Sequence, residues 1–169
     1  MPRVAEVLIA RGDGFVTEVT GEVMLQFGGF AGDRHFGLTR ASDSRTPWHP
    51  RGTVIGNTRQ ISIVSIEECA AVAQDMGIAR IYPSWLGANL AFKNVADLSA
   101  MPPSTRILFP SGATLFVTEE NVPADSRLRS SRMNMDILSR PAPLSKPPLG
   151  DAASSRSLSA RDLSKQTTG

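Results

Sequence analysis

The densest group of residues able to do chemistry is the glycine-rich segment from Gly28 to Gly37, in a chain of 169 residues. Its four glycines surround a carboxylate, a guanidinium and an imidazole. Glycines let a backbone approach a ligand closely, and consecutive backbone amides can bind an anion such as phosphate. If the segment is extended, Asp33 and His35 share one side, where the carboxylate would fix the tautomer of the ring. The alternative is a hairpin loop whose polar side chains only satisfy backbone groups.

Two further polar residues lie near the ends of predicted elements. Arg59, followed by Gln60, opens a predicted strand, and a guanidinium there could bind a phosphate through two hydrogen bonds. The alternative for Arg59 is a solvated charge at a strand end. Asn89 lies in a turn-rich segment after Gly87, and its amide could bind the edge of a heterocycle. The alternative for Asn89 is a turn residue in a left-handed conformation.

Several other chemistries are not supported by the sequence. No Walker phosphate loop is present, and the glycines do not follow the Gly-x-Gly-x-x-Gly spacing. The two histidines, His35 and His49, fit no ligand spacing, so we assign no metal-binding residue. Cys69, the only cysteine, falls on the apolar face of a predicted helix and is expected to be buried and inert. Two of the three lysines follow residue 126, so a pyridoxal phosphate enzyme is not expected.

The elements that position these residues are mostly strands. Alternating or apolar β-rich runs predict strands over 4–9, 22–27, 59–64, 106–109 and 113–118, the last two forming a hairpin. Ser65 and Glu68 match a capping box, which predicts a helix from 66 to about 76 that ends at Gly77. Residues 38–58 form a long polar connection, and loops of that length are often functional. The fold class is therefore mostly β with few helices (α+β).

Charge and composition divide the chain into two parts. Residues 1–125 carry 10 Lys and Arg against 13 Asp and Glu, whereas residues 126–169 carry 8 against 3. All ten aromatic residues lie in the first part, and ten serines and four prolines lie in the second. We expect a folded domain over 1–125 and a disordered basic tail over 126–169. The slightly acidic domain argues against nucleic acid as a partner.

Localisation is suggested by what the sequence lacks. No apolar run is long enough to span a membrane, and the first residues do not resemble a secretory signal. A single cysteine excludes an internal disulfide framework. We therefore expect a cytoplasmic protein that does not bind membranes.

Taken in order, several segments resemble the MOSC family, which is named after the C-terminal domain of molybdenum cofactor sulfurase. The resemblance covers about residues 3–124. Within the family, the chain looks most like the small stand-alone bacterial members. It is carried by Gly32-Asp33-Arg34-His35-Phe36-Gly37, Arg59-Gln60-Ile61-Ser62-Ile63, Gly87-Ala88-Asn89-Leu90, Thr105-Arg106-Ile107-Leu108-Phe109 and Glu120-Asn121-Val122-Pro123.

The resemblance implies a MOSC-type β-barrel with peripheral helices that binds the molybdenum cofactor, a phosphorylated pterin holding the metal through a dithiolene. It also implies sulfur transfer or reduction of N-hydroxylated compounds, with a redox or molybdoenzyme partner. Asp33 and His35 are then candidate catalytic residues. The candidate cofactor-binding residues are Gly32, Asp33, His35, Gly37, Arg59, Gln60, Gly87, Asn89 and Asn121.

The sequence departs from the family pattern in three places. Ala88 replaces a glutamate, and Ala124 replaces the cysteine expected after Pro123, whose thiolate would bind the metal or carry sulfur. The final family strands have no counterpart after Ala124, so the expected barrel is truncated. One inserted base in the codon of Pro123 would restore Pro-Cys-Gly-Phe, so the tail is either out of frame or truly diverged.

Three functions follow from these observations. The first is a MOSC-type sulfur transferase or oxidoreductase, impaired because Ala124 has no sulfur. The second is a non-catalytic protein that binds a pterin or phosphate through the glycine-rich segment, Arg59 and Asn89. The third is an interaction protein whose basic tail binds acidic partners.

Overall fold

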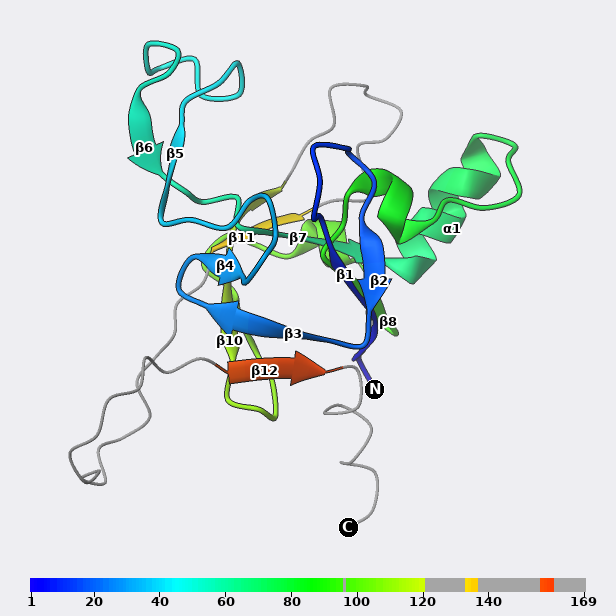
Figure 1. Cartoon of the computed structure of the whole chain (residues 1–169). Helices are drawn as coiled ribbons and strands as arrows, with labels where there is room; N and C mark the ends of the chain where they lie inside the picture. Colours follow the sequence, from blue (N-terminus) through cyan, green and yellow to red (C-terminus); the bar gives the residue numbers. More distant parts are fainter. Residues whose placement is uncertain (96, 121–132, 137–155, 160–169) are drawn as a thin grey trace, which may run out of the picture.

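The computed structural model describes residues 1–95, 97–120, 133–136 and 156–159. Its main element is a seven-stranded mixed sheet in the order β2-β1-β8-β7-β11-β10-β9 (Figure 1). The neighbours are antiparallel except for β7 and β8, which are parallel and are connected through α1. The strands are β1 (Arg3–Ile9), β2 (Glu18–Thr20), β7 (Ile61–Ser65), β8 (Leu90–Lys93), β9 (Arg106–Leu108), β10 (Thr114–Glu120) and β11 (Met133–Asp136).

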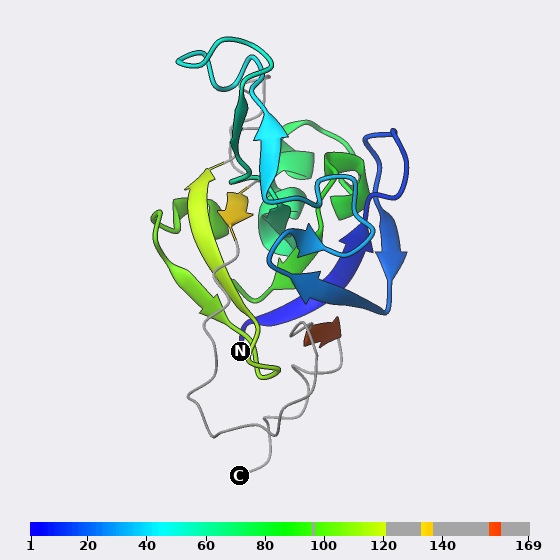
Figure 2. The ribbon, with the colours of Figure 1, turned by 60° about the vertical axis from the view of Figure 1, so that its left-hand side comes forward.

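Two smaller sheets complete the β structure. The first has the order β12-β3-β4 and consists of β12 (Arg156–Ser159), β3 (Glu22–Gln26) and β4 (Gly29–Phe30). The second pairs β5 (Thr39–Ala41) with β6 (Val54–Gly56). This hairpin, residues 39–56, is called the arm below, because it projects from the rest of the molecule in both views (Figures 1 and 2).

The apolar residues form two cores on opposite faces of the central strands. Val7 and Ile9 of β1 pack into the larger core, with Ile61 and Ile63 of β7 and residues of β3, β4, β8 and β10. Leu8, between them in sequence, packs into the smaller core beneath the helix. This division follows from the strand geometry, because successive side chains point to opposite faces of a sheet. Both faces of β7 and of the second half of β1, Val7–Ile9, are therefore largely buried.

The single α-helix of the described residues, α1 (Ile66–Asp75), covers the smaller core. Ser65 is its N-cap and accepts a hydrogen bond from the amide of Glu68 at 3.3 Å, as the sequence predicted. The second half of the expected capping box is absent, because the Glu68 carboxylate instead accepts hydrogen bonds from the amide and hydroxyl of Ser99. Gly77 follows the helix with φ of 67°. Two short 3₁₀ helices, η1 (Pro83–Leu86) and η2 (Leu98–Ala100), lie in later connections.

The mostly β fold class, the N-terminal strand, the capped helix and the hairpin around Pro110 are confirmed. The long connection 38–58 was expected to hold no element, but it contains the arm, whose turn is fixed by hydrogen bonds from Ser42 and Thr53 to the carbonyl of Pro50. No helix among the described residues could cross a membrane.

The expectation of no strands in residues 126–169 is wrong at two places, β11 and β12. Strand β11 pairs with both β7 and β10, and β12 pairs with β3. Pairing with strands of residues 1–120 thus outweighs a local composition that disfavours strands. In the described residues no hydrogen-bonded ladder joins β2 to β9, so the closed barrel stays a prediction.

Candidate functional site

A cavity of about 280 Å³ opens where the arm meets the segment after β4 and the start of β8. Five of its lining residues are cationic or can become so, and one is acidic. They are Arg34, His35, Arg40, Arg45, Arg59 and Asp43. The remaining lining residues are Phe15, Phe36, Thr39, Asn57, Ser62, Gly87 and Asn89. This excess of guanidinium groups suits an anionic ligand.

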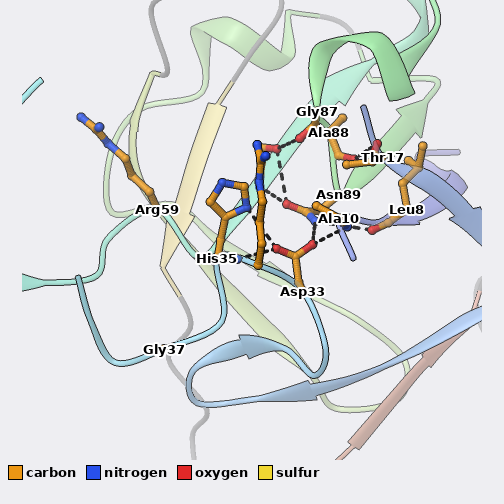
Figure 3. A network of polar contacts seen from close by, with 12 residues as sticks. Leu8, Ala10, Thr17, Asp33, His35, Gly37, Arg59, Gly87, Ala88 and Asn89 are labelled. Carbon is orange, nitrogen blue, oxygen red and sulfur yellow. Dashed lines mark hydrogen bonds and ion pairs between the residues drawn. The ribbon is translucent and has the colours of Figure 1, made fainter. Parts of the chain in front are cut away.

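Behind the cavity wall, the Asp33 carboxylate is at the centre of a hydrogen-bond network (Figure 3). One oxygen, Oδ1, accepts hydrogen bonds from the backbone amide of His35 at 2.8 Å and from its Nδ1 at 3.0 Å. The other, Oδ2, accepts from the amide of Ala10 and from Nδ2 of Asn89, both at 2.8 Å. Burial raises the pKa of the Asp33 carboxyl, but these hydrogen bonds outweigh it and leave the pKa lowered. Asp33 is therefore a fixed anion.

The predicted Asp33–His35 pair is confirmed, but its backbone geometry differs from the prediction. The segment turns, with hydrogen bonds from the Asp33 amide to Phe30 and from the Phe36 amide to Asp33. An aspartate that binds the amide two residues onward makes such a turn locally stable. The pair is thus formed within a turn and not along an extended strand.

The amides of residues 33–37 are not available for the anion cradle that the sequence suggested. Every amide from Asp33 to Gly37 donates a hydrogen bond inside the protein, for example Arg34 to the carbonyl of Ala10 and Gly37 to that of Gly28. Most of these donors are used within the turn itself, and only the Arg34 amide reaches the residue after β1. The positive charge of the site comes from its arginine side chains.

Three arginines lie near Asp43, which follows β5 in the arm. The Arg40 and Arg59 guanidinium groups lie 3.5 Å from the Asp43 carboxylate, and Arg59 also lies 3.3 Å from Glu119. Burial raises the pKa of the Asp43 carboxyl, but the Arg45 amide and the charges of Arg59, Arg40 and Arg45 lower it overall. Arg59 is only 15% exposed and is therefore not a solvated strand-end charge.

One buried donor of Arg40 has no partner among the described residues. Its Nη1 donates to the carbonyl of Ala41, but its Nε is buried and has no hydrogen-bond acceptor in that part of the chain. An unsatisfied buried donor costs about 1–3 kcal/mol. The Arg40 guanidinium, at 17% exposure, lines the cavity and can donate to a bound anion there.

The structure assigns different roles to the other predicted residues. Asn89 lines the cavity, but its amide is used by Asp33 and by the amide of Ser62, so it has no free edge for a heterocycle. Its φ is also not positive, which excludes the left-handed turn. Gln60 is buried and donates to the carbonyls of Phe27 and Gly37. These residues hold the cavity wall together.

The predicted glycines contribute to the site through their backbone conformation and their carbonyl groups. Gly32 and Gly87 adopt positive φ of 83° and 64°, and Gly87 also lines the cavity. The carbonyl of Gly37 accepts hydrogen bonds from Asn57 as well as Gln60. These contacts position the segment between β4 and the arm.

Two predicted positions, Asn121 and Ala124, lie outside the described residues. Cys69 is 2% exposed in the smaller core and lines a separate cavity of about 590 Å³, so its predicted burial is confirmed. Within the described residues, no group of three or more His, Cys, Asp or Glu side chains could hold a metal ion. No sulfur atom of the described residues lines the arginine-rich cavity.

Sequence reasoning missed Arg40, Arg45, Asn57 and the two phenylalanines of the cavity rim. The density of arginines in the 38–58 connection was the available signal, since Arg40, Arg45 and Arg51 lie within twelve residues of one another. Because that connection was interpreted as an irregular loop, nothing indicated that Arg40 and Arg45 line the same cavity as Arg59.

Comparisons with known proteins agree with the fold. The profile described as the MOSC domain matches residues 33–146, and the chain belongs to this family. A Bacillus subtilis (strain 168) protein, YuaD, is 50% identical over 115 residues, which are 68% of this chain. Its name provisionally describes metal-sulfur cluster biosynthesis, and the match spans 60% of its length.

Solved structures show the same fold. The crystal structure of the B. subtilis YuaD protein superposes with a TM-score of 0.73 at 38% identity, over 81% of this chain and 89% of that one. YiiM from Geobacillus stearothermophilus superposes with a TM-score of 0.53 at 10% identity, over 82% of this chain and 69% of that one. The second likeness concerns the fold alone.

Proposed function

We propose that this chain binds the molybdenum cofactor in the arginine-lined cavity, through the phosphate of the pterin. Its membership of the MOSC family supports the cofactor class. The observation that carries the proposal is the excess of guanidinium groups in the cavity lining, where Arg34, Arg40, Arg45 and Arg59 lie with the single carboxylate of Asp43. A guanidinium can hold two phosphate oxygens at once.

The residues of the cavity fit the anionic part of this cofactor. Arg40 and Arg59 are held by Asp43 and Glu119, so their guanidinium groups are oriented before a ligand binds. Preorganised cations of this kind lose little side-chain entropy on binding. When bound, the cofactor supplies the metal and sulfur chemistry, which in this family is sulfur delivery or the reduction of N-hydroxylated compounds.

The exposed rim of the cavity suits transfer to or from another protein. Phe15 and Phe36 line the cavity and are 51% and 44% exposed. Aromatic side chains are enriched in interfaces. We assign to this rim the contact with a redox or molybdoenzyme partner, and the name of YuaD supports a role in metal and sulfur handling.

A non-catalytic version of the same function has its own support. The family pattern needs a cysteine after Pro123, and this chain has Ala124. The described part of the chain places no other sulfur at the cavity. We therefore expect cofactor binding without turnover that depends on a thiolate of this chain.

The test is retention of pterin by the full chain, purified without oxygen from a bacterial host that makes the cofactor. Oxidation releases a fluorescent pterin, which is counted per chain. We expect retention by the parent, a loss of roughly tenfold or more in Arg40→Gln, and a partial loss in Arg40→Lys, which keeps the charge but not the Nε donor.

The matched control is Arg106→Gln, which removes an exposed arginine from β9, outside the cavity lining. It should retain as much pterin as the parent. Absence of pterin from the parent, or equal retention by Arg40→Gln, would refute the proposed function.

A further inference from the structure

All acceptor positions of the Asp33 carboxylate are used. Its two oxygens accept four hydrogen bonds, two each. An ionised carboxylate offers about four such positions. Three of the four donors, the amides of Ala10 and His35 and Nδ2 of Asn89, carry their hydrogens at every pH of interest. The carboxylate therefore has no position left for a proton of its own.

This saturation fixes the tautomer of His35. A carboxylate without a proton can only accept, so Nδ1 of His35 must be the donor across the 3.0 Å contact. The neutral ring then carries its proton on Nδ1, and Nε2 has the free lone pair. His35 lines the cavity, with its side chain 41% exposed, whereas the side chain of Asp33 is fully buried.

The surroundings of the ring favour a negatively charged ligand atom beside it. Arg34, Arg40, Arg45 and Arg59 line the same cavity, against the single carboxylate of Asp43. Arg34 is held by the carbonyls of Asp13 and Gly14. An oxyanion that enters this cavity therefore meets cations from the arm, from the segment before β7 and from the segment that carries His35.

We propose that Nε2 of His35 and the oxyanion of the bound ligand share one proton. This deepens the proposed function and rests on it. When the ligand arrives with an acidic O–H, that bond breaks and an N–H bond forms at Nε2. The ring becomes an imidazolium beside the Asp33 carboxylate, and the ligand remains as the more highly charged oxyanion among the arginines. Asp33 and Asn89 are positioning residues that set which ring nitrogen faces the ligand.

The first experiment measures the tautomer in the unliganded full chain with the site itself unchanged. The chain has two histidines, so nitrogen NMR of the ¹⁵N-labelled protein shows two rings, assigned with His49→Gln. For neutral His35 we expect the proton on Nδ1, whereas His49 should show the mixture typical of an unrestrained ring. A proton on Nε2 of His35 would overturn the proposal.

The second experiment uses inorganic phosphate as the probe and counts protons. At pH 8 phosphate is mostly the dianion and an ordinary histidine is mostly neutral. Calorimetry in buffers of different ionisation enthalpy should then show uptake approaching one proton per phosphate bound. His35→Gln should lose most of this uptake and bind phosphate roughly tenfold more weakly at neutral pH.

The outcomes separate the two proposals. Phosphate binding without proton uptake, or equal uptake by His35→Gln, refutes the shared proton and leaves the proposed function standing. If phosphate does not bind, the proposed function fails, and the shared proton, which rests on it, fails as well. Phosphate binding with uptake that depends on His35 supports both.

Discussion

Asn89 binds the carboxylate of Asp33 at 2.8 Å although the two residues are 56 positions apart. The same Asn89 side chain accepts a hydrogen bond from the amide of Ser62 at 3.1 Å. One buried amide group thus connects the turn after β4 to strand β7. The cavity wall depends on this connection, since Ser62, Asn89 and the partner of Asp33, His35, all line the cavity.

Removal of the Asn89 amide should be costly. In Asn89→Ala the Ser62 amide loses its acceptor and Asp33 loses a donor, in a site where Asn89 is 2% exposed. We expect the free energy of unfolding to fall by about 2–4 kcal/mol, measured by urea titration. Gln74→Ala, which removes an exposed amide from α1, is the control and should change it by about 0.5 kcal/mol or less. Equal effects would contradict the role of Asn89.

The lowered pKa of Asp33 predicts a specific pH dependence of stability. Its native pKa lies below the ordinary value of 3.8, so its contribution is complete above that value. The contribution is lost as the pH falls through the lower native pKa. The unfolding free energies of the parent and Asp33→Asn should therefore differ most near neutral pH and converge as the pH falls below about 4. A gap that is constant from pH 7 to pH 2 would show that ionisation of Asp33 does not contribute.

Gly29 is predicted to be essential for the turn into the glycine-rich segment. Its φ is +116°, and a Cβ there would lie 3.3 Å from Cβ of the buried Gln60. Gly29→Ala should therefore lower the free energy of unfolding by about 1–3 kcal/mol. Gly12→Ala is the matched control, because a Cβ at Gly12 meets nothing within 4 Å. Thermal unfolding of both variants checks this, and equal melting temperatures would count against the strain.

The missing cysteine can be restored. Ala124→Cys returns a thiol to the position where the family resemblance expects one, and a thiolate can carry sulfur as a persulfide. After incubation with a low-molecular-weight persulfide, we expect one extra sulfur atom per chain by intact mass. Ala5→Cys, an exposed position on β1, should take up much less. Equal loading of both variants would show that position 124 has no special reactivity.

The sequence predicted the parts of the fold that depend on local chemistry. Ser65, Glu68 and Gly77 mark the helix because caps act within a few residues. The Asp33–His35 pair was also local, two residues apart. The arm was missed because its strands are short and polar, so no alternating apolar pattern indicates them.

The site was only partly predictable for the same reason. Arg40 is only three positions from Asp43, but Arg59 is sixteen positions from it and approaches it because the chain folds back in the hairpin of β5 and β6. The sequence singled out Asn89, which does line the cavity. It did not show that Ser62 and Asp33 occupy the Asn89 amide, which leaves no free edge for a heterocycle. Long-range partners decide whether a polar side chain is available to a ligand.

The pairing of β1 with β8, in which Val7 lies opposite Leu90, has a consequence for synthesis on the ribosome. At about 5–20 residues per second, the partner of the first long strand is completed roughly 4–16 s after that strand. During this interval β1 can pair only with the short, mostly exposed β2, and the apolar run from Val7 to Ile9 stays without either of its cores. We therefore expect chaperones that bind extended apolar segments to contact Val7–Ile9 during this interval.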